Sequence, residues 1–131
     1  MKSLFYSLVI ISALLPFAGM AQNSTAPWPE LKAFHSFMAA SFHPTEDGNF
    51  KPLRKNADSL LITAKLWQAS AIPADYKLDL TRTTLKKLVK QCTEINEAVK
   101  ANEANDKLKT MITNAHNTFH IIVEKCRTPE K

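Results

Sequence analysis

Apolar residues recur at steps of three and four along most of the chain after residue 28, which is the spacing of one face of an α-helix. This pattern predicts helices at residues 29–43, 51–71, 77–101 and 104–127. The last two ranges carry the clearest stripes: Leu85, Leu88, Val89, Cys92, Ile95 and Val99, then Leu108, Met111, Ile112, Ala115, Phe119, Ile122 and Cys126. Long segments of alternating apolar and polar residues, which would indicate strands, do not occur.

Proline and turn residues fall between these stripes. Pro27 and Pro29 precede the first helix, Pro44 is expected to end it, and Pro52 suits the first turn of the second helix. Residues 47–49 read Asp-Gly-Asn, a typical turn sequence, within the longest predicted connection. Four amphipathic helices with short joints predict an all-α fold, an antiparallel up-down-up-down four-helix bundle.

The beginning of the chain has the three-part pattern of a secretory signal peptide. Lys2 gives a basic start, residues 4–15 form an apolar run, and Gly19-Met20-Ala21 places small residues before a cleavage site. The apolar run is shorter than the roughly 20 residues of a membrane-spanning helix, and no second such run follows. We therefore expect a signal peptide at 1–21, a flexible leader at 22–28, a bundle at 29–131, and an exported, periplasmic, soluble protein without a membrane span.

Length and charge restrict the classes of function. The chain has 131 residues, so that 110 remain after residue 21, enough for one core. Loss of Lys2 lowers the net charge from +5 to +4. The basic residues are spread along the helices, with one tight cluster at Lys86, Lys87 and Lys90, so no nucleic-acid partner is predicted.

The two cysteines, Cys92 and Cys126, both lie in apolar stripes. If the chain turns back near Asn102, the helical rise places them about 20 Å apart along the bundle. A disulfide requires Cα atoms within about 7 Å of each other. We expect buried free thiols, although an oxidising compartment would permit a bridge.

The four histidines are the main candidates for chemistry, because all of them lie in the first or last predicted helix. His116 and His120 are four residues apart and share one helix face. In an up-down bundle these helices are neighbours, so that His35 should lie near His120 and residue 39 opposite His116. We therefore predict a metal site at which His35 joins the pair His116 and His120, with His43 or Glu46 completing the set of ligands. Neutral imidazole binds zinc, copper, nickel or iron.

The last helix also resembles a known family. Asn117-Thr118-Phe119-His120, followed by the basic residues Lys125 and Arg127, looks like the terminal helix of periplasmic four-helix-bundle cytochromes of the b type, with c-prime-like architecture. The resemblance implies that His120 is one axial ligand of haem b and that His35 or Met38 is the other. It implies an electron carrier with a redox partner protein. Covalent haem is not expected, because Cys-x-x-Cys-His is absent.

The sequence gives little support for catalysis, so we predict that the protein is not an enzyme. No nucleophile elbow occurs, and the Glu-x-x-His pattern of di-iron bundles is missing. A third hypothesis is a bundle without a ligand that acts as an interaction module of the cell envelope. Converging histidines would favour a metal, a flat apolar slot would favour haem, and imidazoles pointing apart into solvent would favour the interaction module.

Overall fold

The computed structural model describes residues 27–129. It contains four helices: α1 (Pro29–Glu46), α2 (Lys51–Ala69), α3 (Leu78–Lys100) and α4 (Asn105–Lys125). The described range has no β-strand, only an isolated bridge between Tyr76 and Arg127, so the predicted all-helical class is confirmed. The predicted signal peptide at 1–21 and most of the leader at 22–28 lie outside the described residues.

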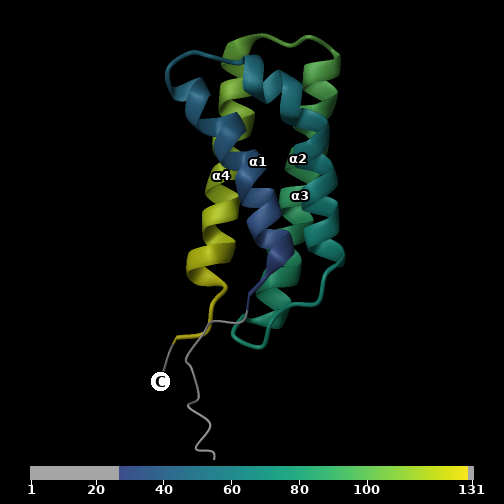
Figure 1. Cartoon of the computed structure of the whole chain (residues 1–131), viewed down its shortest axis with the longest axis vertical. Coiled ribbons are helices and arrows are strands. Elements are labelled where there is room, and N and C mark those ends of the chain that lie inside the picture. Colours follow the sequence, from purple (N-terminus) through teal and green to yellow (C-terminus); the bar gives the residue numbers. More distant parts are fainter. Residues whose placement is uncertain (1–26, 130–131) are drawn as a thin grey trace, which may run out of the picture.

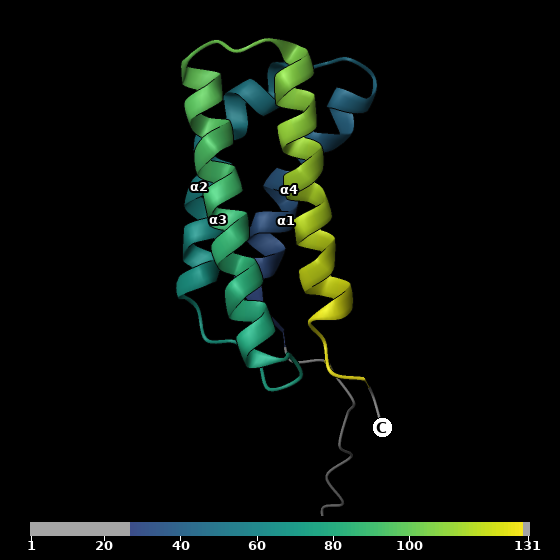
Figure 2. The same ribbon diagram turned by 180° about the vertical axis from the view of Figure 1, so that it is seen from behind.

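The four helices form a ring around one core. α1 contacts α2, α2 contacts α3, α3 contacts α4, and α4 closes the ring on α1. The connections between successive helices lie at alternate ends of the molecule (Figures 1 and 2). Consequently the α1–α4 contact and the α2–α3 contact occupy opposite sides. None of the helices between residues 27 and 129 is long and apolar enough to cross a membrane.

The predicted stripes supply the core. Its aromatic centre is Trp67 of α2, whose side chain is fully buried against three other rings. The ring centroids of Trp28, Phe34 and Phe119 lie 5.5, 5.3 and 6.0 Å from that of Trp67. Trp28 also donates a hydrogen bond from Nε1 to Ser70 Oγ, at 2.8 Å. These contacts join α1, α2 and α4 near the end of the molecule at which α1 begins.

The first helix is longer than the sequence predicted. Pro44 does not end α1, which continues to Glu46 with the proline in its last turn. A proline at this place costs only one backbone hydrogen bond, the one to residue 40. Its carbonyl accepts the amide of Asn49 at 2.9 Å, and Gly48 adopts a left-handed φ of 77°. This is a Schellman-type ending, so the turn predicted at residues 47–49 is confirmed.

The α3–α4 connection ends α3 in the same way without a glycine. Asn102 has a φ of 52°, and the amide of Glu103 donates to the carbonyl of Ala98 at 3.0 Å. Arg54 of α2 secures this turn. Its guanidinium donates to Asn102 Oδ1 at 3.3 Å, to the Glu103 carbonyl at 2.7 Å and to Asn105 Oδ1 at 2.9 Å. The turn predicted near Asn102 is therefore confirmed.

Both cysteines are free and fully buried, as predicted. Burial raises the pKa of the Cys92 thiol to about 12. Cys126 lies next to Thr84, with its Sγ 3.9 Å from Thr84 Oγ1. A thiol with such a pKa stays protonated at neutral pH, and metals bind the thiolate, so Cys92 acts here as a small apolar residue.

Candidate metal centre

The histidines lie where α1 meets α4. We call this surface the α1–α4 seam and define it by six rings: His35, Phe42, His43, His116, Phe119 and His120. Two stacked pairs set its register. The His35 ring lies on Phe119, with centroids 5.1 Å apart and planes within 5°. The Phe42 ring lies on His116 at 3.8 Å and 10°. The sequence placed residue 39 opposite His116, so the observed partner lies three residues, or about one turn, further along α1.

His116 and His120 form the closest histidine contact, and we call them the histidine pair. Their Nε2 atoms are 3.3 Å apart. The other ring nitrogen of His120, Nδ1, lies 2.8 Å from Glu124 Oε1, one helical turn further along α4. A carboxylate accepts the proton of Nδ1, which leaves Nε2 of His120 as the acceptor and makes His116 the donor between the rings.

His43 of α1 lies beside this pair. Its ring centroid is 6.0 Å from that of His116, at an interplanar angle of 72°. Its Nδ1 is 3.0 Å from Glu46 Oε2, and 60% of the side chain is exposed. Each of His43 and His120 thus contacts a glutamate on its own helix.

The structure does not gather all four predicted ligands around one point. Among residues 27–129, no three His, Cys, Asp or Glu side chains are placed so that they could hold one metal ion. His35 is exposed and stacks on Phe119, because the neighbouring Phe34 takes the buried position on that turn. The seam therefore contains a histidine pair, a neighbouring His43 and a separate His35.

The same seam bears on the resemblance to cytochromes. Met38, an alternative haem ligand, is fully buried. The ring of Phe119 contacts both His35 and His120, at 5.1 and 5.5 Å, and also Phe34 at 5.9 Å. A haem held between His120 and α1 needs a flat slot at the place that these packed rings occupy. The residues as arranged therefore do not fit a haem.

Burial and neighbouring charge lower the pKa of His116 below its ordinary value of 6.5. Desolvation is the largest cause, and protonation of His120, His43 or His35 would repel a charge on His116, while Glu46 acts in the opposite direction. His116 is therefore neutral at physiological pH. A neutral imidazole has the lone pair that a metal requires.

Two contacts at this centre were missed from the sequence. Glu124 follows His120 by four residues, the spacing at which side chains of a helix meet. The contact between them could therefore have been predicted from the sequence. Phe42 stacks on a residue of another helix, and its contact depends on the rotation of α1 about its axis. The apolar stripe specified that rotation only approximately.

Comparisons with known protein families, with characterised proteins and with solved structures find no match for this chain.

Proposed function

We propose that this chain is an exported, antiparallel up-down-up-down four-helix bundle that binds a transition metal ion at the α1–α4 seam. Export is suggested by the pattern of residues 1–21. The metal is held by Nε2 of His116 and Nε2 of His120. The role is in metal handling, because the two carboxylates of the seam that contact histidines, Glu46 and Glu124, are each hydrogen-bonded to a histidine of their own helix.

The observation that carries this proposal is the separation of the two Nε2 atoms. Metal–nitrogen bonds of 2.0–2.1 Å in tetrahedral geometry place two ligand nitrogens about 3.3 Å apart. The histidine pair has its Nε2 atoms at 3.3 Å. An ion can therefore be chelated without a change in the distance between the two nitrogens, by rotation of the rings that turns both lone pairs toward it, and this limits the conformational entropy lost on binding.

Glu124 supports the same assignment. Histidines that bind metals commonly donate their other ring proton to a carboxylate, which fixes the tautomer and makes the ligating nitrogen more basic. His120 has this arrangement, with Nδ1 at 2.8 Å from Glu124. For the metal to bind, the proton on His116 moves from Nε2 to Nδ1. Both rings stay neutral, so no net release of protons accompanies binding.

Metal binding is tested on the purified, untagged chain after chelators have removed any metal. Titration with Zn²⁺, Cu²⁺ or Ni²⁺ in a calorimeter should give saturable uptake. His116→Ala and His120→Ala should each weaken it by at least tenfold. Asn114→Ala is the matched control, since this exposed residue lies on α4 about 140° round the helix axis from the pair. A folded chain that takes up none of these ions would refute the proposal.

The same preparation separates the two alternatives. Protein purified without chelators is examined by absorption spectroscopy and elemental analysis. A Soret band would instead support haem b with His120 and either His35 or Met38 as ligands. Neither haem nor metal, with no uptake on titration, would leave an interaction module of the envelope.

A further inference from the structure

The histidine pair supplies only half of the donors of a tetrahedral metal site. Structural zinc, for example, has four ligands. Within the described part of the chain, no third candidate joins the pair in an arrangement that could hold an ion. The nearest histidine, His43, is bonded through Nδ1 to Glu46 at 3.0 Å, and its ring centroid is 6.0 Å from that of His116. Two coordination positions are therefore open on the outer side of the seam.

We propose that a second copy of this chain fills these positions, so that one ion is held by His116 and His120 of both copies. This inference rests on the proposed metal binding. The ion lies on a two-fold axis, and each copy presents the same pair to it. In such an isologous contact both copies use the same surface, so no second binding surface is required on the chain.

The pair is accessible to a partner. The side chain of His120 is 44% exposed, and His116 is half-buried beneath Phe42. At about 100° per residue, His116 lies about 90° and His120 about 130° round α4 from the centre of the buried stripe, at the outer edge of the seam. An ion chelated there has its remaining positions toward solvent, where ligands from another molecule can reach it.

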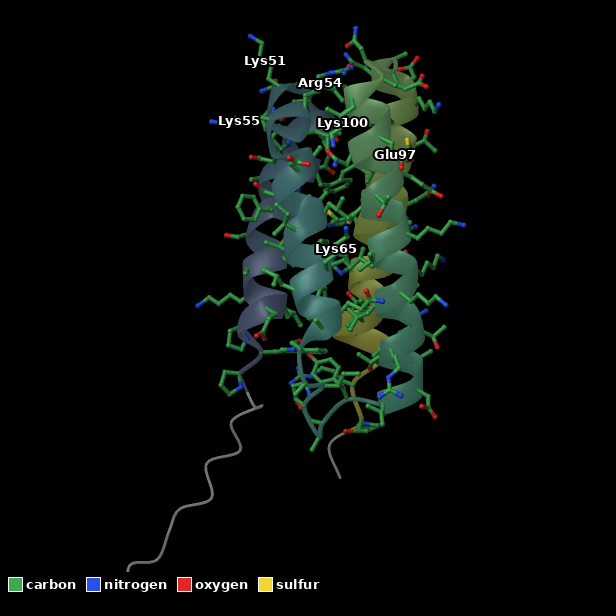
Figure 3. All side chains as sticks on the ribbon, turned by 90° about the vertical axis from the view of Figure 1, so that its right-hand side faces the viewer. Lys51, Arg54, Lys55, Lys65, Glu97 and Lys100 are labelled. Carbon is green, nitrogen blue, oxygen red and sulfur yellow. The ribbon has the colours of Figure 1, made fainter. Side chains whose placement is uncertain are left out.

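The distribution of charge favours contact at this side. Residues 33–50, which include most of α1, contain no lysine or arginine, and neither do residues 110–124 of α4. The chain has 17 such residues in all. Many are on the opposite side, where Figure 3 shows Lys51, Arg54, Lys55, Lys65 and Lys100 on α2 and α3. Lys109 is the basic residue of this side, two turns before His116, with its Nζ 3.3 Å from the Thr45 carbonyl. Two copies that meet through the histidine pairs therefore bring few basic side chains together.

The charge at the site itself also balances. Four neutral imidazoles leave a divalent ion with its full charge of +2. Each copy brings one Glu124, hydrogen-bonded to His120 at 2.8 Å. Two carboxylates in these positions neutralise the ion across the imidazole rings, as in other carboxylate–histidine–metal arrangements. One pair with one carboxylate would leave a net positive charge.

The experiment is a zinc titration of the metal-free chain, followed by light scattering after size exclusion and by elemental analysis of the eluted species. We expect a monomer without zinc, a dimer with zinc, saturation at one zinc per two chains, and return to monomer with a chelator. A monomer that holds one zinc would overturn the second copy and leave the proposed function intact. A folded chain that takes up no zinc would overturn the second copy, and the proposed function falls as well only if Cu²⁺ and Ni²⁺ are not taken up either.

Matched variants locate the contact. His116→Ala and His120→Ala should remain monomeric at zinc concentrations that dimerise the parent chain, with helical content checked by circular dichroism. Asn117→Lys places a positive charge on the solvent side of the pair without removing a ligand, and Asn114→Lys places it further round α4. We expect Asn117→Lys to need at least threefold more zinc for half-dimerisation and Asn114→Lys to match the parent. Equal behaviour of the two lysine variants, or a zinc dimer that survives loss of both histidines, would overturn the proposed contact.

Discussion

The ring of Phe42 lies flat on the ring of His116, with 3.8 Å between their centroids. The contact joins α1 to α4 and covers one face of the imidazole. Desolvation is the largest cause of the lowered pKa of His116. Phe42 thus connects the packing of the seam with the protonation state of a proposed ligand.

Phe42→Leu tests that connection. Leucine keeps an apolar side chain but does not cover the imidazole face, so we expect the pKa of His116 to rise toward its ordinary value of 6.5. The measurement is an NMR titration of the imidazole signals. Phe37→Leu is the control, because Phe37 is a half-buried residue of the same helix that packs against the core. An unchanged pKa in Phe42→Leu would contradict the assigned role of the stacked ring.

The lowered pKa of His116 also gives a direction to the dependence of stability on pH. In the unfolded chain His116 binds a proton near pH 6.5, and in the folded chain only at lower pH. Between these two values the unfolded state holds more protons, so the free energy of unfolding falls as the pH falls. The contribution of His116 to the free energy of unfolding is complete above its ordinary pKa and is lost progressively as the pH falls below that value.

Urea denaturation of the metal-free chain at pH values of about 7.5 and about 5.5 measures this loss. We expect His116→Gln to lose less stability than the parent chain between the two values, because glutamine does not titrate. The comparison subtracts the effects of the other carboxyl and histidine groups. A steeper loss in His116→Gln than in the parent would reverse the predicted sign.

Arg54 offers a test of the fold that is independent of the histidines. Its guanidinium makes three hydrogen bonds to the α3–α4 connection, and the side chain is half-buried. Arg54→Ala removes these bonds and should lower the free energy of unfolding by about 1–2 kcal/mol. Lys55→Ala, at the neighbouring exposed position shown in Figure 3, should change it by less than about 0.5 kcal/mol. Similar losses in both variants would contradict the role of Arg54.

Much of the fold was predictable because burial and turn chemistry are local in the sequence. The stripes through Leu88 and Ile112 place those side chains at 0% exposure, and glycine at position 48 marks the turn that the structure shows. The end of α1 was predicted wrongly, because Pro44 disfavours helix only where its missing amide is needed. The C-terminal end of α1 is set instead by the left-handed Gly48, which follows the turn that contains Pro44.

The candidate site was less predictable because it depends on the rotation of two helices relative to each other. The contact between His116 and His120 lies within one helix, and their spacing was sufficient to anticipate it. Convergence of His35 with this pair required a particular rotation of α1. The burial of Phe34 instead places His35 against Phe119. Because Phe34 rather than His35 takes the inward position on α1, His35 stacks on Phe119 instead of joining the histidine pair.

Glu124 provides the most specific test of the metal centre, because its contact with His120 is direct and its side chain is largely exposed. The carboxylate at 2.8 Å from Nδ1 keeps the proton on that nitrogen and so holds His120 in the tautomer whose Nε2 can bind a metal. Glu124→Gln keeps the size of the side chain and removes the charge. We expect metal affinity to fall by about 10- to 100-fold, as for other carboxylates that orient a ligating histidine.

Calorimetric titration with zinc measures the change, and Glu97→Gln on α3 supplies a charge-matched control that should bind as the parent does. Because the side chain of Glu124 is 62% exposed, its loss should leave the free energy of unfolding nearly unchanged. A weaker affinity with unchanged stability assigns Glu124 to the metal centre, whereas unchanged affinity would show that His120 does not bind the ion through Nε2 as proposed.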